Sequence, residues 1–206
     1  MSLAAVITAD IVNSTRLSKS DHKKLMNSLL FILQEHKNEF FRGDSFQVYI
    51  KSPAEALSIV LQMRTAAMKL SSMQATDIRA SIGIGLVNVP VRSLKTASDE
   101  PFILSGRAFD KMKPDERLLI TASEKNKVVN LGLNVLAQFL DYIFLRLTSK
   151  QAAVVFELLM KRTQTETAKR LKKSQATIHK HTQSAGWPQI EKLLAEYQYL
   201  IQSIEP

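Results

Sequence analysis

The sequence predicts an α+β protein, in which a ferredoxin-like sheet with helices on one face is followed by an all-α helix-turn-helix domain. The first observation is the order of the β-prone and helical stretches, which is βαββαβ and then a further helix and strand, as in a split βαβ sheet. The second is that the last quarter of the chain contains three short helical stretches, each preceded by a capping residue. We therefore expect a sheet domain over residues 1–122, a connecting helix over 123–147, and a helix-turn-helix domain with a C-terminal amphipathic helix over 148–206.

Each element of the front part is predicted from its own pattern. A nearly continuous apolar run over residues 3–12 fits a strand buried on both faces. Ser18 and Asp21 start a helix, and two β-prone runs then flank a hairpin with Gly43-Asp44 at its tip. The remaining elements follow in order: a helix ending near residue 70, an alternating strand over 78–86, a polar loop over 88–101, a short helix over 105–112 and a strand over 117–121.

Composition and charge exclude several classes of function. The 206 residues are 45% hydrophobic, yet no apolar run reaches the roughly 20 residues of a membrane span, and the N-terminus lacks the basic start of a signal peptide. The absence of cysteine excludes disulfides, thiolate catalysis and cysteine-based zinc sites, so we expect a cytoplasmic protein without membrane contact. The net charge is +9, and residues 146–206 carry 10 basic and 5 acidic side chains, against 18 and 14 in residues 1–145. This density of positive charge favours a polyanionic partner at the C-terminal end.

The three short helices carry capping signals at their starts. Thr148 lies three residues before Gln151, and Thr163 lies three residues before Glu166, so each pair can form a reciprocal capping box. Ser174 can cap the third helix through its hydroxyl. These signals predict helices that start at fixed positions and are separated by short turns.

The charge of this segment is typical of DNA-binding proteins. Residues 161–180 contain seven Lys or Arg and one acidic residue, and binding in the major groove requires a tight helix pair with positive charge. The segment resembles the helix-turn-helix of sigma-factor region four and of response-regulator output domains in the residues Thr163, Glu166, Ala168, Leu171, Ser174, Ala176, Thr177 and Ile178. It departs from that family at Lys172 and Lys173, where Gly and an aliphatic residue are usual. A lysine in the left-handed conformation of such a turn costs about 1 kcal/mol relative to glycine.

The resemblance implies a recognition helix that starts after Ser174. Gln175 and Lys180 can reach base edges there, while the lysines of the preceding helix and turn suit phosphates. The expected DNA-binding residues are Lys169, Lys172, Lys173, Gln175, Thr177, Lys180 and His181. The alternative is a small helical bundle that contacts another protein and leaves these lysines in solvent.

A second resemblance lies in the front part of the chain. The segments Ala9-Asp10-Ile11-Val12, Gly43-Asp44 and Ser81-Ile82-Gly83-Ile84-Gly85 resemble the catalytic domain of class III nucleotide cyclases, whose palm fold also occurs in GGDEF domains and polymerases. The resemblance implies that Asp10 and Asp44 bind Mg²⁺ or Mn²⁺ together with a nucleoside triphosphate, because these ions prefer carboxylate oxygens. The nucleotide-binding residues that it implies are Ile11, Asn13, Ser14, Arg42 and Gly43. Alternatively, Asp10 caps the following turn and Asp44 only tolerates the hairpin conformation.

Three positions depart from the cyclase pattern. Phe40 stands where cyclases have the lysine that recognises the base, and Asp110 and Pro114 stand where the transition state would meet Asn and Arg. Without a cation at the leaving phosphate, cyclisation loses its main electrostatic stabilisation. We therefore expect a degenerate site that binds a ligand without cyclising it.

The chain as a whole is similar to the bacterial SatD family in residues 7–14, in the block 42–47 and in the C-terminal helix-turn-helix, which implies a cytoplasmic regulatory protein. The leading hypothesis is a DNA-binding regulator whose degenerate cyclase-like domain senses a nucleotide or a partner. The alternative is a Mg²⁺-dependent nucleotide-processing enzyme that uses Asp10 and Asp44 and carries a basic accessory domain. The last amphipathic helix is expected to pack on the helix-turn-helix or to form a homodimer that suits a palindromic DNA site.

Overall fold

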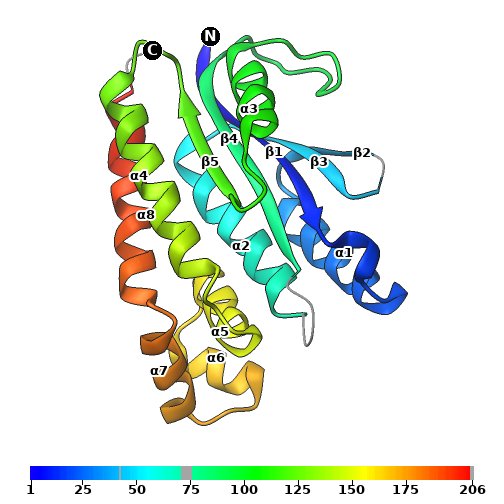
Figure 1. The fold of residues 1–206 in the computed structure, drawn as a ribbon, viewed down its shortest axis with the longest axis vertical. Coiled ribbons are helices and arrows are strands. Elements are labelled where there is room, and N and C mark those ends of the chain that lie inside the picture. Colours follow the sequence, from blue (N-terminus) through cyan, green and yellow to red (C-terminus); the bar gives the residue numbers. More distant parts are fainter. Residues whose placement is uncertain (42, 71–75, 205–206) are drawn as a thin grey trace.

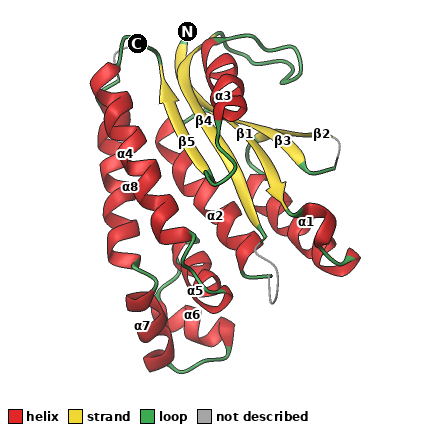
Figure 2. Cartoon of the chain, in the orientation of Figure 1, coloured by secondary structure: helices red, strands yellow, loops and turns green. Residues whose placement is uncertain are grey.

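The computed structural model describes residues 1–41, 43–70 and 76–204 and shows a five-stranded sheet with helices on both faces (Figure 1). The strands are β1 (Ser2–Val12), β2 (Lys37–Phe41), β3 (Ser45–Ile50), β4 (Asp77–Val87) and β5 (Leu118–Ala122). The α-helices are α1 (Lys19–Leu33), α2 (Ala56–Met68), α3 (Glu100–Lys111), α4 (Lys127–Phe144), α5 (Ser149–Leu159), α6 (Gln164–Leu171), α7 (Gln175–Ser184) and α8 (Trp187–Gln202). Two 3₁₀ turns, η1 (Ser14–Arg16) and η2 (Pro53–Glu55), precede α1 and α2 (Figure 2). None of the described helices combines the length and the apolar character that a membrane crossing needs.

The strand order is β2-β3-β1-β4-β5. The pairs β2–β3, β3–β1 and β1–β4 are antiparallel. β5 pairs with β4 in parallel. α1 therefore links β1 to β2 past β3, and α2 links β3 to β4 past β1, which is the interleaved arrangement of a split βαβ sheet. β1 lies at the centre, where Ala5 pairs with Ile50 on one side and with Ile84 on the other. The predicted α+β class is confirmed.

The prediction that the helices cover only one face is wrong. The side chains of β4 alternate, so that Ile82 and Ile84 join the core beneath α2 whereas Gly83 lies against α3. Figure 1 shows α3 in front of the sheet and α1 and α2 behind it. The crossovers β3–α2–β4 and β4–α3–β5 each join two parallel strands, and both run in the same direction across the sheet. Because α2 and α3 lie on opposite faces, the two crossovers have opposite handedness. Because about 98% of such crossovers are right-handed, element order alone points α3 to the wrong face.

A glycine lets α3 lie directly on β4. A Cβ at Gly83 would stand 2.3 Å from the carbonyl oxygen of Pro101 and 2.4 Å from the backbone nitrogen of Ser105, both in α3. Ser81 donates its hydroxyl to the carbonyl oxygen of Ser105 at 2.7 Å, and the hydroxyls of Ser105 and Thr8 lie 3.0 Å apart. Around Gly83, α3 therefore rests on the sheet through backbone contact and short polar side chains, and an apolar cluster that includes Val6, Tyr49 and Phe102 covers the same face beside them.

One apolar core joins the sheet to α2, α4, α5 and α8. It includes residues on both sides of the predicted boundaries, such as Ile120, Leu133 and Val155. Tyr197 of α8 is fully buried, and its hydroxyl donates to the carbonyl oxygen of Pro53 at 2.8 Å. The apolar face of α8 packs against α4, η2 and α2 as well as α7, so it is buried within the chain rather than on the helix-turn-helix alone. The division into three parts remains a prediction.

A buried ion network ties α4 to the sheet. Arg64 of α2 is fully buried, and its guanidinium contacts Asp77 at 2.8 and 3.1 Å and Asp141 of α4 at 2.6 Å. The other oxygen of Asp141 accepts the backbone N–H groups of Arg117 and Leu118 at the start of β5. Burial by itself would lower the pKa of Arg64, but the attraction of Asp77 and Asp141 outweighs it and raises the pKa. The network thereby fixes the position of α4, from which the C-terminal helices continue.

Candidate functional site

Three helices follow residue 148 as the sequence predicts, and each begins at its predicted cap. Thr148 and Thr163 each form a complete capping box with the residue three positions later. The hydroxyl of Ser174 accepts the backbone N–H of Thr177 at 3.1 Å. The starts of α5, α6 and α7 are therefore determined by local hydrogen bonds of capping residues that can be identified in the sequence.

These helices enclose a small apolar core of their own. Ala168 of α6 and Ile178 of α7, both predicted to lie at this contact, pack with Val154 and Leu158 of α5. Leu171 is partly buried against the same cluster. The core holds α6 and α7 in a fixed relation on α5, which a helix pair needs if it is to present one face to a partner.

The turn between α6 and α7 is tight. Lys172 adopts the left-handed conformation, with φ 53° and ψ 48°, at the position where glycine is usual. The N–H of Lys173 donates to the carbonyl oxygen of Ala168 at 3.0 Å, which is the six-to-one bond of a Schellman motif. The turn thus has regular geometry, although the lysine side chain costs about 1 kcal/mol there relative to glycine.

One side of α7 is buried and the other is open. Ile178 and Thr182 are its buried residues, while Gln175, His179 and Lys180 are exposed. The side-chain amide of Gln175 donates to the hydroxyl of Thr165 on α6 at 3.2 Å, so its position is fixed by the neighbouring helix.

The remaining predicted recognition residues are less available. The hydroxyl of Thr177 lies 2.9 Å from that of Ser174 and takes part in the cap, and His181 is only half-exposed. His179, which the sequence interpretation did not assign to DNA, is exposed one turn after Gln175. The four-residue spacing from Gln175 is the signal that could have identified it.

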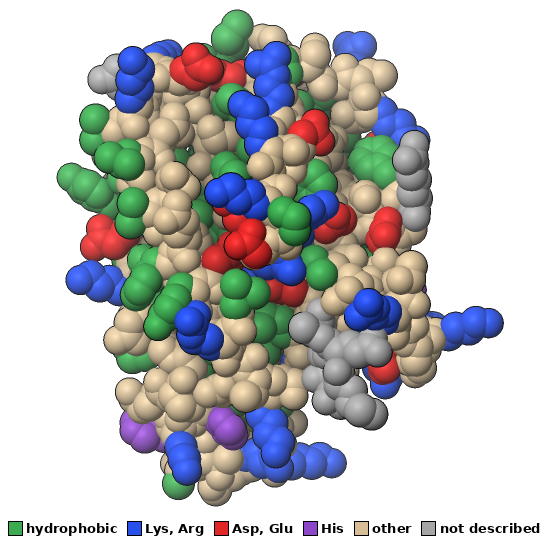
Figure 3. All heavy atoms as spheres, in the orientation of Figure 1, with side chains coloured by type: hydrophobic (Ala, Val, Ile, Leu, Met, Phe, Trp, Pro, Cys, Tyr) green, Lys and Arg blue, Asp and Glu red, His purple; other side chains and the backbone are tan. Residues whose placement is uncertain are grey.

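Positive charge gathers at this end of the molecule. Four exposed lysines of α6, the turn and α7 make no ion pair with any described residue: Lys169, Lys172, Lys173 and Lys180. Arg162 and Arg170 differ, because both contact one oxygen of the buried Glu157, at 2.6 and 2.8 Å. Figure 3 shows several Lys and Arg side chains and two His side chains at the lower end of the molecule, where α6 and α7 lie. The lysines are therefore free to contact an extended anion.

The second candidate site lies at the end of β1. Asp10 pairs in register with Arg79 of β4, and the side chains form an ion pair at 2.7 Å. The guanidinium of Arg79 also lies over the ring of Phe109 on α3, 4.7 Å from its centre. Oδ1 of Asp10 and Nε of Arg79 are buried without a hydrogen-bond partner among the described residues. One oxygen of Asp10 is thus held by a side-chain cation and the other is unpartnered.

Asp44 lies at the tip of the β2–β3 hairpin, as predicted. Gly43 before it has a positive φ of 87°, and the carbonyl oxygen of Asp44 accepts the N–H of Ile11 at 3.0 Å. Its carboxylate accepts the hydroxyl of Ser14 at 2.9 Å. Asn13, which lies between Ile11 and Ser14 in the chain, adopts the left-handed conformation with φ 59°. The hairpin tip therefore meets the end of β1, and both aspartates contact protein groups.

In this arrangement a divalent ion at Asp10 would compete with the guanidinium of Arg79. No group of three or more His, Cys, Asp or Glu that could hold a metal occurs among residues 1–41, 43–70 and 76–204. Arg79 neutralises Asp10, and its positive charge opposes a second cation at the same carboxylate. Arg42, the predicted nucleotide ligand, lies outside the described residues. The assignment of Asp10 and Asp44 to a metal remains a prediction, and a metal would have to displace Arg79.

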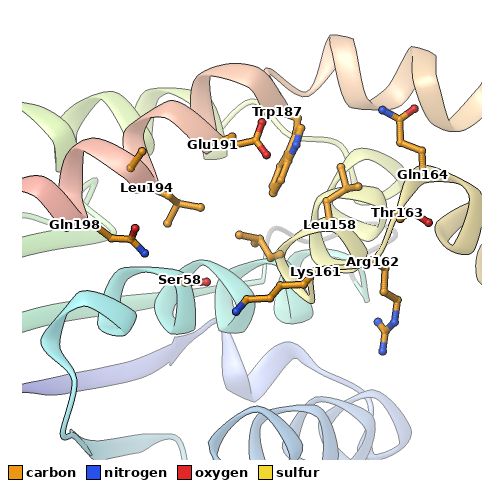
Figure 4. A pocket seen from close by; sticks show the side chains of 12 residues that line it. Ser58, Leu158, Lys161, Arg162, Thr163, Gln164, Trp187, Glu191, Leu194 and Gln198 are labelled. Atoms are coloured by element: carbon orange, nitrogen blue, oxygen red, sulfur yellow. The ribbon is translucent and has the colours of Figure 1, made fainter.

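A cavity of about 530 Å³ lies between α2, the α5–α6 connection and α8 (Figure 4). Figure 4 shows the side chain of Lys161 extending toward Ser58 of α2, and Trp187 and Glu191 on the α8 side. Lys161 has a positive φ of 59° at the end of α5. The cavity combines three segments that are far apart in the chain, so no sequence motif marked it. A ligand there would contact α2 as well as the C-terminal helices α5 and α8.

No protein-family model and no curated protein matches the sequence, so the resemblances to the SatD family and to the sigma-factor helix-turn-helix have no family match. One solved structure that matches is the crystal structure of the guanylyl cyclase Cya2. It is 13% identical with a TM-score of 0.40, over 58% of this chain and 74% of that chain. Similarity at this level establishes neither a family nor an activity.

Proposed function

We propose that the protein is a regulator that binds double-stranded DNA through α6 and α7. The observation that carries the proposal is the open face of α7, which presents Gln175, His179 and Lys180 beside lysines that form no ion pair with the described residues. A DNA-binding role also implies the cytoplasmic location that the sequence predicts.

The dimensions and charges of the helix pair suit the major groove. The groove is about 12 Å wide and accepts a helix of roughly 10–12 Å diameter. With α7 in the groove, Gln175 and Lys180 are within reach of base edges. Lys169, Lys172 and Lys173 would then meet phosphates along the rim, where point charges position the protein without reading sequence.

Two groups of variants separate these roles. Replacing Lys172 and Lys173 with alanine should weaken binding to all duplexes alike and reduce the slope of log K against log salt by about one unit per lost contact. Replacing Gln175 or Lys180 should instead reduce the discrimination between sites, by roughly 1–3 kcal/mol per contact. Fluorescence anisotropy with labelled duplexes at several salt concentrations measures both quantities.

The matched control is Lys19→Ala with Lys23→Ala, two exposed lysines on α1. These substitutions remove the same charge as the Lys172 and Lys173 pair and should leave affinity unchanged at moderate salt. An equal loss in both double variants would mean that only net charge drives binding, and it would contradict the assignment to α6 and α7.

The sensor role of the front domain is a further part of the proposal. Asp10 has an unpartnered buried oxygen, and Asp44 lies at the adjoining hairpin tip, so a nucleotide with Mg²⁺ could engage this edge only by displacing Arg79. The ion pair would then act as a barrier to metal binding. No catalytic step is assigned to these residues.

Thermal denaturation with ATP or GTP and Mg²⁺ or Mn²⁺ tests this site, because a ligand that binds only the folded state raises Tm. We expect a small shift for the wild type, a larger one for Arg79→Gln, and none when Asp10→Asn and Asp44→Asn are combined with it. Asp21→Asn, an exposed carboxylate on α1, is the control. If Arg79→Gln shows no gain with any nucleotide and metal, both aspartates are structural.

A further inference from the structure

α4 exposes an apolar stripe along its whole length. Six large side chains on its outer side are between 46% and 83% exposed: Val128, Leu131, Val135, Phe139, Tyr142 and Leu145. Figure 3 shows hydrophobic side chains along the left of the molecule, where α4 runs in Figure 1. The opposite side of α4, with Leu133, Leu136 and Leu140, is buried in the main core. The helix is therefore apolar on both sides, and among the described residues only one side has a partner.

We propose that this stripe is the interface of a parallel homodimer, in which α4 pairs with α4 of a second copy. The exposed residues follow a heptad: Val128, Val135 and Tyr142 occupy one position at seven-residue intervals, and Leu131 and Leu145 occupy the position three residues later. In a parallel coiled coil, Val at the first of these positions with Leu at the second favours two strands over three or four. Gln138 is the one polar residue in the seam and is exposed, so it can pair with its copy and fix the register.

The area of the stripe suits a second copy. The exposed fractions correspond to on the order of 500 Å² of apolar surface per copy, which is at the upper end of the roughly 300–600 Å² of the largest patch on a typical monomer. A standard interface buries about 800 Å² per partner. Asn134 and Arg146, which are exposed beside the stripe, supply a polar rim that adds to this area.

Charge at the two ends of α4 selects the parallel direction. Between Lys127 and Arg146 the only charged side chain is Asp141, and it is buried against Arg64. An antiparallel pair would place Lys127 of one copy beside Arg146 of the other, whereas a parallel pair keeps these like charges at opposite ends. Between Lys127 and Arg146 the exposed face carries no charge that would recognise an acidic or basic partner, which also favours an identical face over an unrelated charged one.

Part of the surface is already ordered. The rings of Phe139 and Tyr142 are parallel to within 2° with centres 6.1 Å apart, and the guanidinium of Arg146 lies 3.6 Å from the centre of the Tyr142 ring. Arg146 also donates to the carbonyl oxygen of Tyr142 at 2.8 Å. Side chains fixed before association lose less conformational freedom when they are buried.

The parallel direction has a consequence for the proposed DNA binding, on which the dimer itself does not depend. α4 runs into α5 through residues 145–148, and α5, α6 and α7 lie beyond its C-terminal end (Figure 1). Two parallel copies therefore place both α7 helices at the same end of the assembly. This is the arrangement that two half-sites about 34–36 Å apart require.

Sedimentation velocity without DNA tests the dimer. At micromolar concentration the wild type should have twice the mass of one chain. Val135→Lys should be a folded monomer, with a Tm that no longer depends on protein concentration. Phe31→Lys, which changes a side chain 52% exposed on α1, is the matched control and should remain dimeric. A wild type that is monomeric up to high micromolar concentration, or a dimer that Val135→Lys leaves intact, would overturn the proposal.

The direction is tested by oxidative cross-linking, since the chain contains no cysteine of its own. Leu131→Cys should form a covalent dimer on mild oxidation, because a parallel pair brings the two copies of residue 131 together. Cross-linking only in a mixture of Leu131→Cys and Tyr142→Cys chains would show an antiparallel pair and overturn the stated direction. A dimer that does not bind DNA would contradict the proposed function alone, and a monomer that reads a DNA site would contradict the dimer alone.

Discussion

Replacing Arg64 with methionine is expected to destabilise the protein by about 3–5 kcal/mol, the usual cost of removing one partner from a buried ion network. The substitution leaves Asp77 and Asp141 facing each other in the core without their cation, although the side-chain volume is nearly preserved. It also removes the link between α2 and α4. Urea denaturation measures the loss as a lower midpoint at an unchanged slope.

The control for this prediction is Arg79→Met, the same substitution in an ion pair whose side chains are 29% and 24% exposed. This pair is more exposed than the network around Arg64, so its loss should cost less than the loss of Arg64. If Arg64→Met unfolds at the same urea concentration as Arg79→Met, the network is not the structural link described for it.

Gly83→Ala is the second substitution with a large expected effect, a loss of about 3 kcal/mol, at the upper end of what overpacking usually costs. The new Cβ would lie 2.3 Å from one backbone atom of α3 and 2.4 Å from another, and backbone atoms cannot move aside as a flexible side chain does. α3 would have to shift away from β4. Chemical denaturation of the variant measures the cost.

Gly106→Ala is the matched control for this prediction. Gly106 lies in α3, and a Cβ there meets nothing within 4 Å, so alanine should stabilise the helix by roughly 0.5–1 kcal/mol. A Gly83→Ala protein as stable as the wild type would show that α3 does not rest on β4 through this glycine.

The features predicted correctly from the sequence are those that depend on neighbours in the chain. Thr148, Thr163 and Ser174 cap α5, α6 and α7 because each hydroxyl meets an N–H three residues later. The same reasoning should have started α3 at Glu100 rather than near residue 105. Pro101 lies in its first turn, a favoured place for proline that the sequence contains.

The features that were missed depend on pairing between distant segments. The ion pair of Asp10 with Arg79 was not predicted, because the two residues lie on different strands and their register on β1 and β4 does not follow from the residues beside either of them. The crossover through α3 has the rare left-handed sense, so the face of the sheet that α3 covers could not be predicted from the order of the elements.

The exposed stripe on α4 is a second feature that depends on distant segments and therefore could not be predicted from the sequence. Leu136, Phe139 and Leu140 are apolar residues within the connecting helix predicted over residues 123–147, and nothing in the sequence distinguishes them. Only the structure separates them, because Leu136 and Leu140 enter the core whereas Phe139 stays exposed. Which apolar side of a helix finds a partner within the chain is decided by tertiary packing.

Selection of duplexes from a random-sequence library by the full-length wild-type protein tests the central claim most directly. The account predicts that successive rounds converge on a defined site, which the protein binds at least about 10³-fold more tightly than random duplex at the same salt concentration. Convergence should be lost when Gln175 and Lys180 are replaced together. A library that never converges, with equal affinity for selected and random duplexes, would contradict DNA recognition by α7 and leave the C-terminal helices as a protein-contact module.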